Sequence, residues 1–245
     1  GDTVFEMTRS FNKVTFKLRE HLERLYRSVK YLRIPLEMTI DDMEKACLKT
    51  QEANEPAFAS DDEHRLMINV TRGLLSIYEG IDGATKGCNV IISDFPLRWT
   101  TAGMGKLYDS GINCVIPSQR AIPASLLEPK VKSRSRIHYL MANIQASQMK
   151  GENNWPILLD PDGFIAEGTG YNFFIVRYGE GIFTPEGRNC LRGISREYIK
   201  QLNGYTEKNI ELYDVSYADE AFVTGTPSCM LPVVSFNGIP IRDGK

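Results

Sequence analysis

The sequence reads Pro129-Lys130-Val131-Lys132-Ser133-Arg134-Ser135-Arg136 where a helical pattern begins, and later reads Ala166-Glu167-Gly168-Thr169-Gly170-Tyr171-Asn172-Phe173-Phe174 where a strand pattern begins. The first stretch places a lysine at the opening of an apolar-striped helix. The second carries an acidic residue into a glycine-rich turn. Helical and strand patterns alternate outward from both stretches, so the sequence predicts an α/β (α+β) fold.

Length and composition narrow the class of protein. The chain has 245 residues, 42% of them hydrophobic, which is enough to bury the core of one large domain or two small ones. The formal net charge of -2 gives no general attraction to nucleic acid or to anionic lipid. No apolar run approaches the roughly 18 residues of a membrane span, and no signal peptide is recognisable. We therefore expect a cytoplasmic protein that binds neither nucleic acid nor membrane.

Spacing disfavours three other kinds of site. The cysteines are odd in number and lack C-x-x-C spacing, which argues against a disulfide framework or a zinc knot. The histidines have no ligand partner at useful spacing, so no metal site is expected. Gly103-Met104-Gly105-Lys106 is followed by Leu107 and lacks the upstream glycine of a P-loop. The residues concerned are Cys47, Cys88, Cys114, Cys190 and Cys229, and His21, His64 and His138.

Hydrophobic periodicity predicts the elements of each half. In the first half we expect a hairpin over Asn12-Lys13, helices over 20–32 and 39–52, and strands over 66–71, 89–93 and 114–116. In the second half we expect a helix over 135–149, hairpins over 157–165, 173–183 and 233–241, a helix beginning near Ser195, and strands over 210–215 and 220–224. A proline-marked segment between the halves is the candidate linker.

Four segments carry the chemistry. A lysine amine and a carboxylate, in that order, are the groups an enzyme needs to hold an aldehyde cofactor by its carbon and by its ring nitrogen. Lys130 competes with Lys132 for the first role, and Glu167 alone could be an edge-strand charge. A third segment opens a helix and reads Leu191-Arg192-Gly193-Ile194-Ser195-Arg196. The backbone amides at the start of this helix could bind a phosphate, although Ser195 could equally be a plain N-cap. The fourth segment is a strand followed by a turn and reads Phe222-Val223-Thr224-Gly225-Thr226-Pro227-Ser228. Its turn could add a hydroxyl to the phosphate site.

In this order the four segments resemble the class IV, or fold-type IV, pyridoxal-phosphate aminotransferases. That family includes branched-chain amino acid aminotransferases, D-amino acid aminotransferases, (R)-selective amine transaminases and aminodeoxychorismate lyases. The resemblance covers nearly the whole chain and includes Gly1-Asp2-Thr3-Val4-Phe5-Glu6, His21-Leu22-Glu23-Arg24-Leu25 and Val70-Thr71-Arg72-Gly73. It implies a homodimer whose chains have a smaller N-terminal α/β domain (1–118), a linker (119–123) and a larger C-terminal cofactor-binding domain with a barrel-like β core (124–245).

The resemblance also assigns roles for the cofactor, pyridoxal 5'-phosphate, bound between the two domains. Lys132 would form the Schiff base and then shuttle a proton between substrate and cofactor, which an amine does only when neutral. Glu167 would pair with the pyridine nitrogen. Arg24 would bind the phosphate, although it could instead lie on the exposed face of its helix. The remaining phosphate-side residues implied are Gly193, Ile194, Ser195, Gly225 and Thr226.

On the substrate side the resemblance implies Phe5, Arg136, Thr226 and Pro227. On the expected helix Lys132 and Arg136 are four residues apart and share a face, so Arg136 could bind a substrate carboxylate or only lower the pKa of the lysine. The segment Glu167 to Asn172 is similar to the branched-chain form. The Arg-x-His pair of D-amino acid aminotransferases is missing from Leu74 to Glu79. We therefore expect amino transfer from a branched-chain L-amino acid to a 2-oxo acid such as 2-oxoglutarate or pyruvate.

Several alternatives stay open at this point. D-amino acid transfer, (R)-amine transfer and aminodeoxychorismate lyase activity all occur on the same fold, and so could a non-catalytic binding module, because a motif does not guarantee turnover. Family members usually have a strand before the Gly1 segment and a helix after the final Asp-Gly-Lys. The printed sequence is therefore expected to be the ordered part, or a fragment, of a longer chain.

Overall fold

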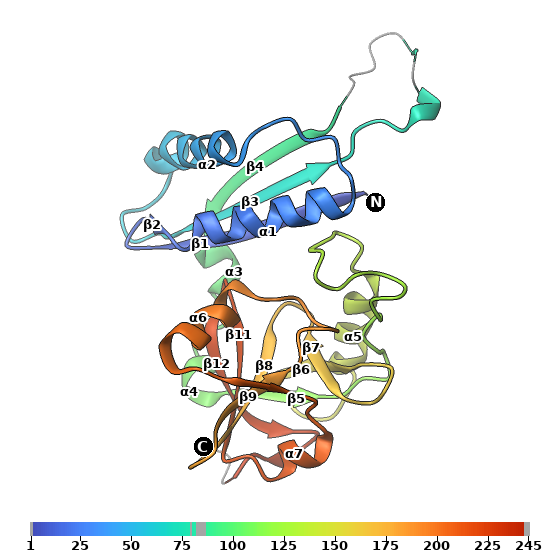
Figure 1. The fold of residues 1–245 in the computed structure, drawn as a ribbon. Coiled ribbons are helices and arrows are strands. Elements are labelled where there is room, and N and C mark those ends of the chain that lie inside the picture. The colour runs from blue at the N-terminus through green and yellow to red at the C-terminus, as the bar shows by residue number, and fades with distance from the viewer. Residues whose placement is uncertain (1, 79, 82–86, 243–245) are drawn as a thin grey trace. The chain divides into compact units, whose positions relative to one another are not determined.

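The structure is a computed structural model that describes residues 2–78, 80–81 and 87–242. The chain forms two compact units (Figure 1). The first unit comprises Gly1–Thr101 together with Val131–Ser135, and the second comprises Ala102–Lys130 together with Arg136–Lys245. A short segment that contains Lys132 thus belongs to the unit built by the N-terminal part of the chain. The division into domains at 119–123 stays a prediction.

The first unit is an antiparallel sheet in the order β2-β1-β3-β4. Burial alternates strictly along β3, so that His64, Leu66, Ile68 and Val70 face the core. The two-residue turn Asn12-Lys13 has both residues in the left-handed region, as a tight hairpin with this twist requires. The elements are β1 (Thr3–Phe11), β2 (Val14–Thr15), α1 (Leu18–Tyr31), α2 (Ile40–Asn54), η1 (Glu55–Ala57), β3 (His64–Thr71), η2 (Ser76–Tyr78), β4 (Asn89–Pro96) and α3 (Arg98–Thr101).

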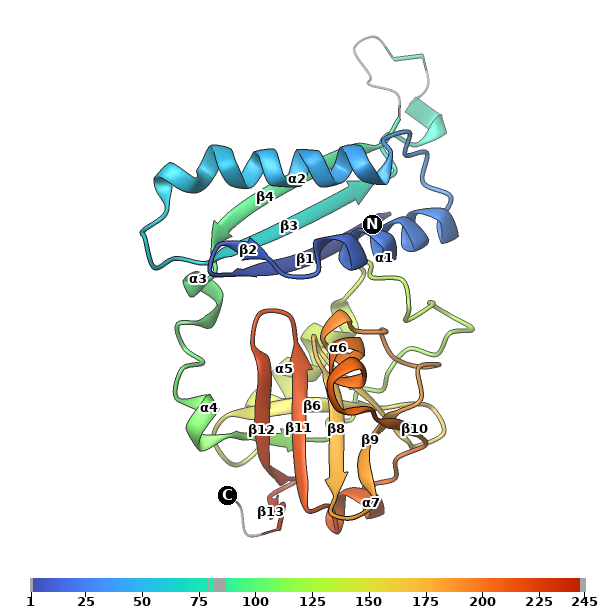
Figure 2. The same ribbon diagram turned by 60° about the vertical axis from the view of Figure 1, so that its left-hand side comes forward.

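Helices α1 and α2 pack side by side on one face of this sheet (Figures 1 and 2). Leu22 and Leu25 of α1 and Met43 and Cys47 of α2 meet the inward residues of β1 and β3 in one core. Thr39 caps α2 by accepting a hydrogen bond from the Asp42 amide at 3.2 Å. Glu6, on the inner face of β1, is in contact with α1 through His21 and Arg24.

The second unit is built on a nine-stranded sheet in the order β10-β9-β8-β11-β12-β5-β6-β7, with β13 paired to β12. Figure 2 shows β12, β11, β8 and β9 side by side. The sheet curls until β7 contacts β8, which encloses an apolar core. The elements are α4 (Leu107–Ser110), β5 (Ile112–Val115), α5 (Ile137–Ser147), β6 (Asn154–Leu159), β7 (Ile165–Gly168), β8 (Asn172–Arg177), β9 (Gly181–Pro185), α6 (Ile194–Asn203), β10 (Thr206–Lys208), α7 (Leu212–Ser216), β11 (Glu220–Gly225), β12 (Cys229–Phe236) and β13 (Ile239–Pro240).

Two sequence predictions about local structure are wrong. The strand expected over 210–215 is instead the helix α7, because the side chains of Glu211 and Asp214 form a reciprocal capping box at its start. The lysine does not open a helix either, because α5 begins only at Ile137. Lys132 and Arg136 therefore do not share a helical face, and they belong to different units. The α/β fold class itself is confirmed.

None of the helices within the described residues combines the length and the apolar character that a membrane crossing would need.

Candidate active site

The Lys132 segment pairs with the N-terminal strand of the first unit. The Phe5 amide donates to the Lys132 carbonyl at 2.9 Å, the Arg134 amide donates to the Thr3 carbonyl at 2.9 Å, and Val4 and Ser133 form a β-bridge. An extended segment held by backbone hydrogen bonds from its Lys132 carbonyl and its Arg134 amide fixes where the lysine side chain starts. The lysine is thus positioned by β1 rather than by a helix.

Two basic side chains lie close to the Phe5 ring. The Lys132 Nζ is 4.8 Å from the centroid of the Phe5 ring, and the Arg134 guanidinium carbon is 3.9 Å from it. Arg134 is held in turn by the Asn69 Oδ1, which accepts from its Nε at 3.0 Å and from its Nη2 at 2.7 Å. The ring face attracts both cations and orients the lysine amine. Phe5, predicted on the substrate side, therefore contacts the predicted catalytic lysine.

Arg24 lies in a buried polar cluster under α1. Its Nε and Nη2 donate to the two carboxylate oxygens of Glu6, at 2.6 and 2.8 Å, and the Glu6 carboxylate also contacts the His21 Nδ1 at 2.8 Å. Arg24 is 6% exposed, while Glu6 and His21 are fully buried. The alternative in which Arg24 lies on an exposed helix face is therefore wrong. Glu6 fixes the orientation of the guanidinium through a bidentate pair.

Contacts within this cluster shift the pKa values of Glu6 and His21. Burial tends to raise the pKa of Glu6, but the positive charge and hydrogen bonds of Arg24 outweigh it and hold that pKa far below its usual range. Burial lowers the pKa of His21, and the charges of Arg24 and Lys132 act in the same direction against the pull of Glu6. These effects favour the neutral imidazole. Because an ionised carboxylate only accepts, the His21 hydrogen is on Nδ1.

In the second unit, Glu167 is a nearly buried carboxylate at the end of β7. It is 5% exposed. Its Oε1 accepts from the Tyr139 hydroxyl at 2.8 Å, and its Oε2 accepts from the Leu191 amide at 3.0 Å and from the Asn172 Nδ2 at 3.4 Å. Burial and the adjacent Glu167 charge raise the pKa of Tyr139 well above its usual value, so the phenol keeps its proton and donates. These donors stabilise Glu167 as an anion.

The N-terminus of α6 lies beside this carboxylate. Its N-cap is Gly193, with no side-chain cap, and Ser195 is already inside the helix. The plain N-cap reading of Ser195 is therefore wrong, and the first-turn amides are not capped by a side chain. A Cβ at Gly193 would lie 2.2 Å from the Asn172 Oδ1, so glycine is required for this approach. Asn172 thereby joins the carboxylate to a helix end suited to an anion.

The turn that follows β11 lies next to the glycine-rich turn that follows Glu167. Gly225 comes so close to the Gly170 carbonyl that a Cβ would lie 3.1 Å from that oxygen. Thr224 pairs in register with Asn172, and among the residues that the structure describes its buried Oγ1 has no hydrogen-bond partner. Thr226 and Pro227 follow in the turn, both half-buried. The turn after β11 therefore lies against the glycine-rich turn that follows Glu167.

Arg136 immediately precedes α5, in the second unit. Its Nη2 donates a hydrogen bond to the Thr169 carbonyl, and its guanidinium carbon lies 4.9 Å from the centroid of the Tyr139 ring. Tyr139 is the residue that donates to Glu167. Arg136 is therefore fixed beside the carboxylate through both the glycine-rich turn and the tyrosine.

The amine of Lys130 already has an ion-pair partner and a hydrogen-bond acceptor. Its Nζ forms an ion pair with Glu128 at 2.5 Å and donates to the Arg188 carbonyl at 3.2 Å. Lys132, in contrast, lies against an aromatic face in the first unit. The two lysines, indistinguishable by spacing, therefore have different surroundings.

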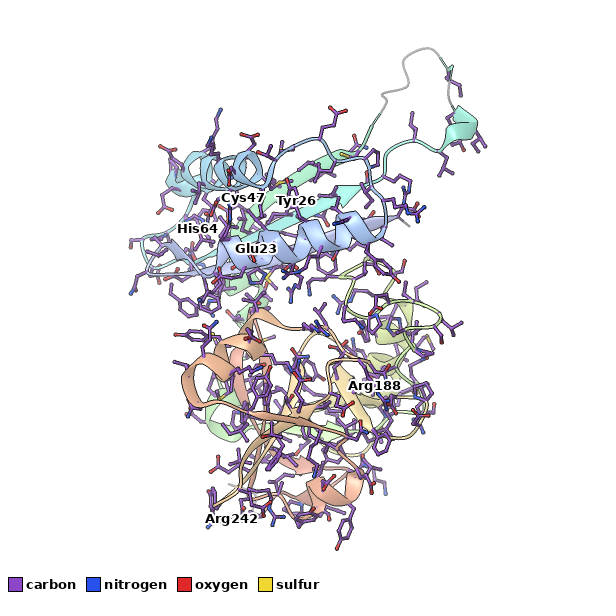
Figure 3. The ribbon with its side chains drawn as sticks, viewed as in Figure 1. Glu23, Tyr26, Cys47, His64, Arg188 and Arg242 are labelled. Atoms are coloured by element: carbon purple, nitrogen blue, oxygen red, sulfur yellow. The ribbon has the colours of Figure 1, made fainter. Side chains whose placement is uncertain are left out.

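The most deeply buried thiols are poor nucleophiles. Burial raises the pKa of Cys47 and of Cys190 to about 12, and raises that of Cys114 as well. Figure 3 labels Cys47 on α2 and Tyr26 on α1, and burial raises the pKa of that tyrosine to about 12 too. Burial therefore favours the thiol form of the three cysteines over the thiolate at neutral pH.

The sequence did not predict the residues that form hydrogen bonds to Arg24 and Glu167. Glu6 and His21 support Arg24, and Tyr139, Asn172 and the Leu191 amide support Glu167. Glu6 carried a usable signal, because it is a carboxylate that directly follows the apolar pair Val4-Phe5 in a strand. The Leu191 amide carried none, because a backbone donor leaves no mark in a sequence.

Comparisons with known proteins identify the family of the chain. The family model described as class IV amino-transferase matches residues 3–236. A Methanocaldococcus jannaschii protein provisionally named a branched-chain-amino-acid aminotransferase is 34% identical over 248 residues, spanning 99% of this chain and 81% of that protein.

Among solved structures, the branched-chain amino acid aminotransferase of Escherichia coli superposes with a TM-score of 0.84 at 27% identity, over 99% of this chain and 80% of that one. The branched-chain amino acid aminotransferase of Thermobaculum terrenum, solved in its pyridoxal-phosphate form, has the same fold, with a TM-score of 0.82 at 22% identity over 98% and 78% of the two chains. The chain belongs to the class IV aminotransferase family.

Proposed function

We propose that this protein is a pyridoxal-phosphate-dependent enzyme that transfers the amino group of a branched-chain L-amino acid to a 2-oxo acid such as 2-oxoglutarate or pyruvate. One observation carries the proposal. In the second unit a buried, donor-stabilised carboxylate, Glu167, is joined through Asn172 to a helix N-terminus without a side-chain cap. A carboxylate and an anion site in one polar network suit a ring nitrogen and a phosphate of one cofactor.

The donor set fits pyridoxal phosphate. A primary amine (Lys132) suits an aldehyde, and a guanidinium (Arg24) and the α6 amides suit a phosphate. The buried Thr224 Oγ1, which has no hydrogen-bond partner among the described residues, is a further polar atom on the strand residue that pairs in register with Asn172. The names of the relatives support the branched-chain substrate. When bound, the cofactor supplies an electron sink for the carbon that loses its proton.

The chain's own groups then have separate tasks. Glu167 holds the proton on the ring nitrogen, because an anion beside it favours the charged form. The Lys132 amine would take a proton from the substrate α-carbon and pass it to the cofactor carbon that carried the aldehyde, from the position set by β1 and Phe5. Arg24, Gly193, Ile194, Ser195, Gly225 and Thr226 bind the phosphate side. Phe5, Arg136, Thr226 and Pro227 bind the substrate side.

We also propose that the protein is a cytoplasmic homodimer. An apolar stripe on α5 supports the dimer, because Ile137, Leu140, Met141 and Ile144 recur at helical spacing and are 75%, 56%, 41% and 40% exposed. Analytical ultracentrifugation of the purified protein would test it. A monomer at micromolar concentration would contradict the proposal.

A spectrum and a substrate panel test the activity. Pyridoxal phosphate should give the purified protein a visible absorption band, and borohydride should then fix the cofactor onto Lys132, as read by peptide mass spectrometry. L-leucine, D-leucine and an (R)-amine should be compared as donors with 2-oxoglutarate and pyruvate. A colourless protein would contradict the cofactor assignment. Faster turnover with D-leucine or the amine would overturn the substrate assignment.

Glu167→Gln should lower kcat by about 10²–10³-fold, because a neutral amide no longer stabilises a protonated ring nitrogen. Glutamine still accepts from the Leu191 amide, so the melting temperature should change little. Steady-state kinetics and a thermal melt check both expectations. Glu180→Gln is the matched control, since Glu180 is an exposed residue of the same unit whose carboxylate pairs with Arg177. Equal kcat values for the two variants would remove Glu167 from the proposed chemistry.

A further inference from the structure

Lys132 and Arg134 lie on the same side of the segment that pairs with β1. In an extended segment every second side chain points to the same side. Both side chains meet the Phe5 ring, whose centroid lies 4.8 Å from the Lys132 Nζ and 3.9 Å from the Arg134 guanidinium carbon. A second basic group therefore lies beside the amine that we propose to be reactive.

Contacts with neutral groups orient Arg134. Its Nε and Nη2 donate to the Asn69 Oδ1 at 3.0 and 2.7 Å, and Asn69 pairs in register with Phe5. An amide oxygen and an aromatic ring fix the direction of the guanidinium without neutralising its charge. Arg134 is exposed, so a ligand from solvent can reach it.

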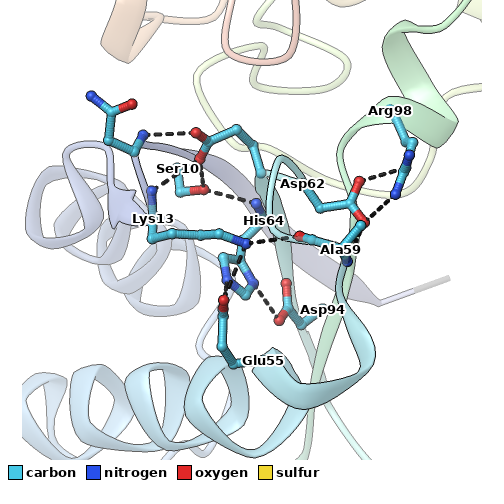
Figure 4. A network of polar contacts seen from close by, with 10 residues as sticks. Ser10, Lys13, Glu55, Ala59, Asp62, His64, Asp94 and Arg98 are labelled. Atoms are coloured by element: carbon cyan, nitrogen blue, oxygen red, sulfur yellow. Dashed lines mark hydrogen bonds and ion pairs between the residues drawn. The ribbon is translucent and has the colours of Figure 1, made fainter.

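Two carboxylates of the same sheet point to its other face. Glu6 of β1 pairs with Arg24 of α1. On β4, the Asp94 Oδ2 lies 2.8 Å from the His64 Nδ1, and the His64 Nε2 lies 2.6 Å from the Glu55 Oε2 of η1 (Figure 4). Both carboxylates therefore lie on the face that the helices cover, opposite to that of Phe5.

The face that carries Phe5 is basic and apolar. Taking every second residue of β1, β3 and β4 from Phe5, Asn69 and Ile91, the described strands place no aspartate or glutamate on this face. Ile91 is 52% exposed there, and the Met67 sulfur contacts the Arg134 Nη2. The face therefore favours an anion that carries an aliphatic group.

The α-carboxylate of an amino acid suits the spacing of the two basic groups. Standard bond lengths place its carbon about 2.5 Å from the amino nitrogen, and a charge-assisted hydrogen bond adds about 2.8 Å. That span is of the same scale as the separation of two groups that both lie within 4.8 Å of one ring centroid. We propose that Arg134 binds the α-carboxylate of the amino acid donor and of the 2-oxo acid acceptor.

The sequence had suggested Arg136 for this role. The Arg136 Nη2 donates to the Thr169 carbonyl, and its guanidinium carbon lies 4.9 Å from the Tyr139 ring centroid, with all three residues in the second unit. Arg134 belongs to the same unit as Lys132. The carboxylate, though not the substrate side as a whole, is thereby reassigned. This inference rests on the proposed function, because it takes Lys132 as the reactive amine.

Two matched probes test the role of Arg134. 4-Methylpentanoate and 4-methylpentanamide share one aliphatic group, have no amino group to transfer, and differ in the charge of the head group. In isothermal titration of the full chain loaded with pyridoxal phosphate, the parent should bind the acid at least about tenfold more tightly than the amide. Arg134→Gln should weaken binding of the acid at least about tenfold and change binding of the amide by less than about twofold. Arg134→Lys should keep part of the preference, because it retains the charge and loses the planar fork.

Two further variants assign the effect to one arginine. Arg27→Gln is the matched control, since Arg27 is an exposed arginine on α1 of the same unit, 4.0 Å from Glu23, and it should leave both affinities unchanged. Arg136→Gln should keep the preference for the acid. If Arg136→Gln abolished that preference while Arg134→Gln kept it, the carboxylate would belong to Arg136 and the proposal would be wrong.

Steady-state kinetics identify which carboxylate is bound. Arg134→Gln should raise the KM of both L-leucine and pyruvate at least about tenfold, because each carries only an α-carboxylate. An effect confined to 2-oxoglutarate would place Arg134 at the second carboxylate of that acid and overturn the proposal. The variant should keep the cofactor absorption band and the borohydride labelling of Lys132. Loss of either would mean that Arg134 only positions the lysine, which would overturn the proposal as well.

This inference and the proposed function fail in different ways. A parent protein that stays colourless with pyridoxal phosphate would overturn the proposed function, and this inference with it. A coloured parent that transfers amino groups, and whose Arg134→Gln variant binds the acid and the amide as the parent does, would overturn this inference alone.

Discussion

Lys132→Ala should reduce amino transfer by about 10⁴-fold or more and should abolish borohydride labelling of the chain. The alanine removes both the amine that holds the cofactor aldehyde and the base that moves the substrate proton, and general acid–base catalysis alone is worth up to about 10⁴-fold. The backbone hydrogen bonds from Phe5 and Arg134 do not involve the side chain and should survive. Single-turnover kinetics and mass spectrometry of the reduced protein measure the two effects.

Lys130→Ala is the matched control for this prediction, since Lys130 is two residues away and was equally eligible by sequence. Its amine already pairs with Glu128, and its loss should cost at most a few-fold in activity. Methylamine added to Lys132→Ala should restore part of the rate, because a free amine can move the same proton. If Lys130→Ala were the inactive variant, or if Lys132→Ala retained its label, the assignment of the lysine would be wrong.

The sequence predicted the elements whose pattern is local. The Asn12-Lys13 hairpin, α1 and α2 follow from turn chemistry and helical periodicity, and the structure has all three. The helix α7 escaped prediction because a capping box of Glu211 and Asp214 overrides the β-branched residues beside it. Apolar pattern alone cannot weigh that local hydrogen bonding against strand propensity.

The position of Lys132 escaped prediction for a different reason. Its neighbours read as the start of a helix, yet the segment pairs with β1, which lies far away in the sequence. Non-local pairing of this kind leaves no periodic trace. The same holds for Glu167, whose importance was predicted but whose partners, Tyr139 and the Leu191 amide, come from α5 and from the loop before α6. The spacing of residues in a sequence can indicate a reactive side chain. The hydrogen-bond partners of that side chain depend on the fold.

The buried cluster of Glu6, Arg24 and His21 should dominate the stability of the first unit. Glu6→Gln should destabilise that unit by about 3–5 kcal/mol, because it leaves the buried Arg24 guanidinium without its counter-charge. Hydrogen exchange of the β1 and α1 amides measures this unit without the second one. Glu23→Gln is the control, since Glu23 is exposed and lies 4.0 Å from Arg27, and it should change stability by less than about 0.5 kcal/mol.

The same carboxylate predicts how stability depends on pH. Because folding depresses the pKa of Glu6, its contribution is fully present above the unfolded value of about 4.3 and is lost as pH falls below that value towards the folded one. From this group alone the free energy of unfolding should fall by about 1.4 kcal/mol per pH unit below about pH 4. Glu6→Gln has no such proton to bind, so its stability should be flatter over that range. Parallel acid profiles for the variant and the parent protein would mean that the Glu6–Arg24 pair is not what holds α1 against the sheet.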